Sequence, residues 1–218
     1  MTATRTDRPL GRVGAWMGIV FVVLFVVGFL IFPTPDNNKH TAQWVRWWTD
    51  SGHRTAAMIG AYLMVLGVLA FVWFASSLRD RLGDGSSLVL TFGSIFAALA
   101  LVSIVVRASI PGAKQFGDTP VPTGDFARQF DQIGFGLLLV AGALAAGLFV
   151  VFASYLASRT ATLPGWLCVA GYVVAALQIV AAVFLPFVLF FLWVLVAAIV
   201  LVRRGARTEI AVSRAPTG

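Results

Sequence analysis

Six long runs of apolar residues alternate with short polar segments along the chain, and this pattern predicts six membrane-spanning helices. A helix needs about 20 residues to cross a hydrocarbon core of about 30 Å. The predicted spans are 14–32, 56–78, 87–106, 133–156, 166–185 and 187–202. The last two are counted separately because Pro186 interrupts the run, and because one helix over 163–202 would be about 60 Å long. The predicted fold class is all-α, a polytopic membrane helix bundle.

The segments outside the apolar runs predict two tails and two long connections. Residues 1–12 and 204–218 are arginine-rich and are expected to be disordered, which leaves 13–203 as the membrane domain. The first run ends in Pro33-Thr34-Pro35-Asp36 without a small-residue cleavage site, so we interpret it as an anchor rather than a signal peptide.

Three tryptophans, Trp44, Trp47 and Trp48, lie in the first long connection, where they predict a short helix on the bilayer surface. The second connection, 112–130, is rich in Gly, Pro and Asp, and Pro111 is expected to stop the third span before it.

An internal repeat relates two parts of the chain. Residues 71–102 align without a gap on 149–180 with 12 identities in 32 positions, whereas chance would give about a tenth. Spans two and three therefore correspond to spans four and five, in the same direction, which predicts a parallel repeat of a helix hairpin. Residues 128–134 echo 54–60 at a spacing shorter by four, so the fourth span is expected to hold one extra turn.

Composition supports a membrane protein, since 59% of the residues are hydrophobic and 11% are charged. A soluble domain of this composition would expose large apolar patches. The net charge of +7 is read as a topology signal rather than as a sign of nucleic-acid binding. Ten basic residues lie in the two tails and the two tight turns and six in the long connections, so both termini are predicted to be cytoplasmic.

Candidate chemistry inside the membrane is sparse. No Lys, His, Asp or Glu falls well inside a predicted span, which argues against a retinal protein, a bis-histidine haem bundle and a carboxylate proton relay. The single cysteine, Cys168, excludes an intrachain disulfide and a thiolate cluster. We predict no cofactor and no metal.

Five polar residues at similar depth in the outer half could form an outward-facing vestibule. They are Tyr62, Ser103, Arg107, Asp131 and Gln178. The alternative is that Arg107 snorkels to the headgroups, Asp131 caps a helix start and Gln178 makes one interhelical hydrogen bond.

A second cluster, Asp50, His53 and Arg54, precedes the second span at the outer mouth. Together with His40 it has the ligand types of a metal or enzyme site. The alternative is a helix start capped by Asp50. No serine lies in a nucleophile-elbow motif, so no catalytic residue is assigned.

Two spans have distinctive packing surfaces. The fourth is rich in small residues (Gly134, Ala141, Gly142, Ala145, Ala146, Gly147) and is expected at the bundle centre, where close approach of backbones is useful. The sixth carries Phe187, Phe190, Phe191 and Trp193 and is expected to form a wall facing lipid or another subunit.

The stretch from Trp44 to Arg81 resembles a family of small uncharacterised multi-span membrane proteins common in actinobacteria. The resemblance rests on the run from Trp47 to Arg54 and on the span ending in Phe74-Ala75-Ser76-Ser77-Leu78-Arg79-Asp80-Arg81. It implies a bacterial inner membrane location. That family has no assigned activity that the resemblance could carry over.

The leading functional hypothesis is a non-catalytic integral membrane protein that serves as an assembly partner or binding module, in contact with lipid and with further copies or other membrane subunits. The main alternative is a small-solute or lipid transporter that uses the outer vestibule. A weaker one is a membrane enzyme that uses the loop around His53.

Overall fold

The structure, a computed structural model, describes residues 9–35, 40–83, 85–179 and 185–213, and within them the side chains of 13–35, 40–83, 85–179 and 186–204. These residues are helical nearly throughout and include no strand, which confirms the all-α prediction. The helices are α1 (Pro9–Ile31), α2 (Thr41–Thr49), α3 (Ser51–Leu82), α4 (Ser87–Gly117), α5 (Gly124–Gly136), α6 (Ala143–Thr160), α7 (Gly165–Leu177) and α8 (Leu185–Ser213), and a π-helical segment, η1 (Leu137–Gly142), joins α5 to α6.

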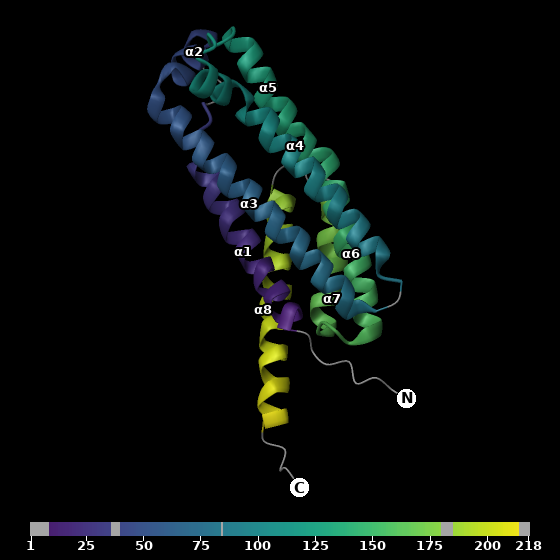
Figure 1. Ribbon diagram of the computed structural model, residues 1–218. Helices are drawn as coiled ribbons and strands as arrows, with labels where there is room; N and C mark the ends of the chain where they lie inside the picture. Colours follow the sequence, from purple (N-terminus) through teal and green to yellow (C-terminus); the bar gives the residue numbers. More distant parts are fainter. Residues whose placement is uncertain (1–8, 36–39, 84, 180–184, 214–218) are drawn as a thin grey trace.

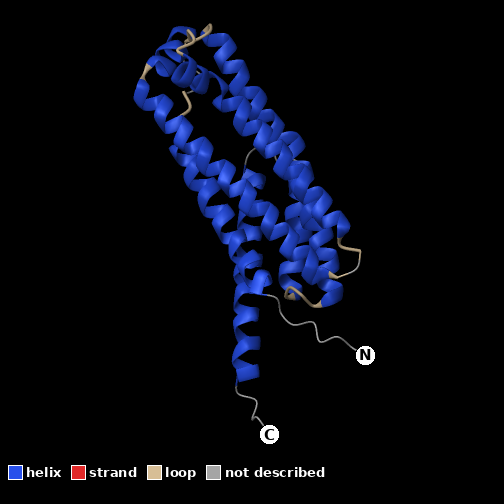
Figure 2. Cartoon of the chain, in the orientation of Figure 1, coloured by secondary structure: helices blue, strands red, loops and turns tan. Residues whose placement is uncertain are grey.

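The long helices lie side by side in an elongated bundle (Figure 1). α2 and the start of α5 close one end, which we call the outer end, and α8 projects beyond the other, the inner end (Figure 1). The described loops lie at these two ends (Figure 2). This arrangement leaves the middle of the bundle to apolar helix surfaces.

Five helices within the described residues are long and apolar enough to cross a membrane: Val13–Ile31, Ser51–Leu82, Ser87–Gly117, Gly124–Thr160 and Pro186–Arg204. The protein is therefore a multi-pass membrane protein in contact with lipid. The predicted fifth span corresponds to α7, whose 13 residues are about 20 Å long. The end of that predicted span, at 180–184, lies outside the described residues.

Several helices extend beyond the predicted boundaries. α4 passes through Pro111 and ends only where Asp118 takes a left-handed conformation (φ 47°), so the predicted stop at Pro111 is wrong. Contacts of the extension with α3 hold it in place, including that of Gln115 with Arg54. Residues 9–12 and 204–213, predicted to be disordered, are helical, because extending an existing helix costs far less than starting one. The remainder of both tails, 1–8 and 214–218, lies outside the described residues.

Phenylalanine rings from five helices form the centre of the bundle. Phe21 of α1, Phe71 of α3, Phe96 of α4, Phe149 of α6 and Phe190 of α8 are all fully buried. Ring centroids are 4.9 Å apart for Phe21 and Phe71 and also for Phe96 and Phe190. Aromatic pairs at such distances add to the free energy of burial.

This aromatic core corrects the prediction for the sixth span. Phe187, Phe190, Phe191 and Trp193 are buried inside the bundle rather than forming its outer wall. Because lipid and a protein core are both apolar, composition alone does not distinguish the two surroundings of a membrane helix.

The backbones of α1 and α3 approach each other closely at two glycines. A Cβ added to Gly28 would lie 2.6 Å from the carbonyl oxygen of Gly60, and a Cβ added to Gly60 would lie 2.6 Å from the carbonyl oxygen of Gly28. α1 also packs on α3 more extensively than any other pair of helices does. The small residues of the fourth span are largely buried too, with Gly147 against Gln178.

The predicted short helix of the first connection is α2, but the tryptophan belt assigned to it is wrong in part. Trp44 and Trp48 are buried within the outer end, where Phe32 packs on Trp48 at 6.4 Å between ring centroids. α2 contacts α3, α4 and α5, so its rings fill the space between these helices rather than facing lipid.

Candidate functional site

A buried ion pair joins α4 to α5 near the outer end. Arg107 Nε donates a hydrogen bond to Asp131 Oδ1 at 2.9 Å, and the two side chains are only 4% and 6% exposed. Arg107 Nη2 also donates to Thr34 Oγ1, 3.0 Å away, in the segment after α1. One guanidinium thus connects three parts of the chain.

Aromatic rings surround the same guanidinium. Arg107 Cζ lies 3.9 Å from the ring centroid of Phe135, 4.7 Å from that of Phe32 and 5.8 Å from that of Phe29. Cation–π attraction of this kind strengthens when water is excluded. The predicted snorkelling of Arg107 to the headgroups is therefore wrong, because its charge is balanced by Asp131 inside the bundle.

Ser103, one turn deeper on α4, supports the same junction. Its hydroxyl donates to the carbonyl oxygen of Gly134 at 2.7 Å. A side chain at Gly134 would collide with Cγ of Arg107, so the glycine lets α5 approach the arginine. Ser103, Arg107 and Asp131 thus lie at one buried junction between α4 and α5, in which Ser103 bonds to Gly134 and Arg107 bonds to Asp131. The sequence identified Gly134 only as a small residue.

Tyr62 and Gln178 lie elsewhere. The Tyr62 side chain is 64% exposed on the outer surface of α3, where it lines the apolar groove described below. Gln178 is 1% exposed at the end of α7 and donates from Nε2 to the carbonyl oxygen of Pro186 at 2.7 Å, which joins α7 to the first turn of α8. The five predicted vestibule residues therefore divide among three places.

The π-helical segment η1 follows the ion pair directly along the chain. Each π turn accommodates an extra residue relative to an α-helix.

The outer cluster of Asp50, His53 and Arg54 forms the corner between α2 and α3. Asp50 is the N-cap of α3 and accepts a hydrogen bond from the backbone N–H of His53 at 3.0 Å. The His53 ring stacks on Trp47 with 3.7 Å between ring centroids and an interplanar angle of 7°. Arg54 Nη1 donates to the carbonyl oxygens of Trp48 (3.1 Å) and Thr49 (2.6 Å), which end α2. Each of the three side chains thus has a role in shaping this corner.

Asp50 provides a pH-dependent contribution to stability. The hydrogen bond from the His53 N–H holds the pKa of Asp50 below its ordinary value of 3.8. Since the folded-state pKa is lowered, this contribution is present above pH 3.8 and is lost as the pH falls through the lowered value.

Asp50→Ala is therefore expected to lower the thermal unfolding midpoint in detergent at pH 7, whereas Asp50→Asn, which keeps the cap oxygen, should lower it less. Equal midpoints for wild type and Asp50→Ala would contradict this role.

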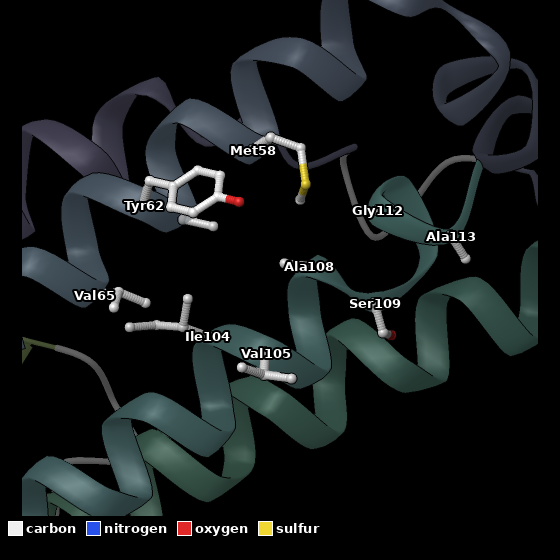
Figure 3. Close-up of a pocket in the computed structure, with 10 residues that line it drawn as sticks. Met58, Tyr62, Val65, Ile104, Val105, Ala108, Ser109, Gly112 and Ala113 are labelled. Atoms are coloured by element: carbon white, nitrogen blue, oxygen red, sulfur yellow. The ribbon is translucent and has the colours of Figure 1, made fainter. Parts of the chain in front are cut away.

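An apolar groove of about 270 Å³ opens between α3 and α4 in their outer halves (Figure 3). Its lining from α3 is Met58, Ala61, Tyr62 and Val65, and its lining from α4 is Ile104, Val105, Ala108, Ser109, Gly112 and Ala113. In Figure 3 Met58, Tyr62 and Val65 of α3 lie across the opening from Ile104 and Ala108 of α4. The α3 residues recur at the spacing of one helix face. Sequence reasoning missed this groove, because in an all-apolar helix that spacing has no polar contrast.

Chemistry that requires several ligating or nucleophilic groups finds little support in the geometry. Among the described residues, no three His, Cys, Asp or Glu side chains come close enough together to hold a metal ion. His40 precedes α2 and makes no side-chain capping hydrogen bond. The described residues offer two candidate features, the ion pair between α4 and α5 and the apolar groove between α3 and α4.

Comparison of the chain with known protein families, with curated proteins and with solved structures gives no significant match.

Proposed function

We propose that this protein is a non-catalytic binding module of the membrane, and that the groove between α3 and α4 is its binding surface. The single observation that carries the proposal is the groove itself, an apolar opening between two membrane-spanning helices. Binding sites are typically concave, largely apolar and edged by a few polar groups. The lining of this groove is almost wholly apolar, and the Ser109 hydroxyl donates to the carbonyl oxygen of Val106 on its own helix, so the groove suits an apolar ligand segment.

The ion pair favours a structural role over a catalytic one. Arg107 and Asp131 already bind each other, and the arginine also binds Thr34. An intramembrane charge is by default a candidate for function. In this protein its partners belong to the chain itself, which favours a role in holding α1, α4 and α5 together.

Filling the groove is expected to weaken binding. Ala108→Leu adds three carbon atoms to the lining, which would displace about two methylene groups of a bound chain at about 0.8 kcal/mol each, or about tenfold in affinity. The measurement is photolabelling in vesicles with a phospholipid that carries a diazirine in its acyl chain, followed by mapping of the labelled residues by mass spectrometry. Label is expected to concentrate on the groove residues of α3 and α4.

Val102→Leu is the matched control, because Val102 lies on the same helix, is exposed and does not line the groove. It should leave the labelling of the groove unchanged. Label spread evenly over all lipid-facing helices of the wild type would refute the proposed binding surface.

A small-solute or lipid transporter is the second candidate, and the observation that favours it is the ion pair beside the π-helical segment. π turns are frequent at functional sites. Under this reading Arg107→Ala and Gln178→Leu would abolish uptake into vesicles. Because Arg107→Ala also leaves Asp131 buried without its partner, uptake is compared at equal amounts of folded protein. The enzyme alternative rests on Asp50 and His53, whose hydrogen bonds to the α2–α3 corner favour a structural role.

The proposal includes six traverses with α7 as a short fifth, both termini in the cytoplasm, and an inner membrane location in a bacterium. Exposed aromatic side chains near the inner end are as expected at a membrane–water interface on either side of the bilayer: Trp16, Trp73, Tyr155 and Trp166. The orientation is supported by Arg79, Arg81 and Arg159 at the inner end, in line with the excess of basic residues on the cytoplasmic side.

The proposal also keeps the parallel repeat, in which α3–α4 corresponds to α6–α7. Equivalent residues have similar surroundings, since Phe71 and Phe149 are both fully buried and their ring centroids are 5.2 Å apart. Gly93 of α4 lies against Ala75 of α3, and the equivalent Gly171 of α7 lies against Ser154 of α6.

A further inference from the structure

The outward end of the groove is bridged by a polar contact between its two walls. Arg54 lies one helical turn before Met58 on α3, and Gln115 lies two residues after Ala113 on α4. Arg54 Nε donates to Gln115 Oε1 at 3.0 Å. Side chains of a helix lean toward its amino end, so the guanidinium lies outward of Met58.

This guanidinium is fixed in place and its charge is not neutralised by a direct ion pair. Nη1 is held by the carbonyl oxygens of Trp48 and Thr49 and Nε by Gln115, whereas none of the hydrogen bonds among the described residues uses Nη2. Nor does Arg54 form an ion pair within 4.0 Å of a described carboxylate. Of the two nearby acidic residues, Asp50 accepts from His53 and Asp118 is paired with Lys114.

The groove and the arginine together match the shape of an amphiphile. The lining from Ile104 to Ala113 extends about 14 Å along α4, which suits a length of acyl chain rather than a compact solute. A chain seated there places its headgroup at the outward end, where Arg54 lies. Guanidinium groups recognise phosphate through paired, charge-assisted hydrogen bonds.

We propose that the groove holds an acyl chain of a glycerophospholipid from the outer leaflet and that Arg54 binds its phosphate. This inference rests on the binding function proposed above and adds to it the chemical class of the ligand. Gln115 is a positioning residue, because it acts on the ligand through Arg54.

The test compares two photoreactive lipids with the same diazirine-bearing chain in vesicles of uncharged lipid. One is a phosphatidylglycerol and the other is the matching diacylglycerol, which lacks the phosphate. In the wild type the phosphatidylglycerol is expected to label the groove residues about tenfold more than the diacylglycerol does, the effect of one charge-assisted hydrogen-bonded contact. Equal labelling by both lipids would overturn the assignment of phosphate to Arg54 while leaving the groove as a chain-binding surface.

Variants identify the residue responsible. Arg54→Gln should reduce labelling by phosphatidylglycerol to the level of the diacylglycerol. Arg54→Lys should retain part of the preference, because it keeps the positive charge but loses the paired N–H donors of the guanidinium. The matched control is Arg128→Gln, which removes another outer positive charge, from α5, and should keep the full preference. A full preference in Arg54→Gln would overturn the proposal. Because the wild-type comparison of the two lipids needs no variant, the proposal stays testable even if Arg54→Gln misfolds.

Discussion

Asp131→Asn is expected to destabilise the protein by about 3–5 kcal/mol, because it leaves the charge of Arg107 buried without a counter-ion. Thr34 and the three surrounding rings would still contact the guanidinium, but a neutral hydroxyl and aromatic quadrupoles compensate a buried charge less well than a carboxylate does. The measurement is the free energy of unfolding in detergent micelles under a denaturant titration.

The double variant Arg107→Leu/Asp131→Leu tests the same idea in the opposite direction. Replacing both members of a buried ion pair by apolar side chains is often neutral or stabilising, so this variant should be more stable than Asp131→Asn. Asp118→Asn is the exposed control, since Asp118 pairs with Lys114 at the surface, and its stability should stay close to that of the wild type. A double variant less stable than Asp131→Asn would show that the junction depends on more than its charge balance.

Gly60→Ala is expected to destabilise the protein by about 1–3 kcal/mol through overpacking, since the new Cβ would lie 2.6 Å from a backbone oxygen of α1. Backbone atoms cannot rotate away as a flexible side chain can, so α1 and α3 must separate along their whole contact. Gly28→Ala should act similarly, and the double variant should cost less than the sum because the first substitution already separates the helices. Thermal unfolding of the single and double variants measures both effects.

Gly136→Ala is the matched control for this pair. Gly136 is helical, and nothing lies within 4 Å of the position that its Cβ would take. Alanine there should stabilise the protein by about 0.5–1 kcal/mol, the usual gain over glycine within a helix. A Gly60→Ala variant as stable as Gly136→Ala would mean that the α1–α3 contact does not constrain the fold.

The depth of the charged residues was predictable, but their pairing was not. The ends of the apolar runs place Arg107 and Asp131 near the outer end, because a charged residue limits how far a run extends into hydrocarbon. Which groups meet there depends on how α4, α5 and the end of α1 are rotated about their axes. Tyr62 illustrates the limit, since it shares the predicted depth yet lies on a different face.

The corner between α2 and α3 shows the same difference between local contacts, which the sequence predicts, and long-range contacts, which it does not. Asp50 followed three residues later by His53 could be read as a helix start, and the structure has that cap. The contact of Arg54 with Gln115, which lies 61 residues away, had no signal in the sequence. It exists because α4 continues past Pro111, which local rules predict to be a stop.

The sequence by itself determined that this is an all-helical, multi-pass membrane protein. The length and polarity of each apolar run are local properties, and they decide whether that segment inserts into the bilayer. Only the tertiary structure decided which faces meet: the glycine contact of Gly28 with Gly60, the burial of the Phe-rich face of α8, and the groove between α3 and α4. The physical reason is that lipid and protein interior are similarly apolar, so hydrophobicity selects the spans while close packing, a property of pairs of helices, selects their partners.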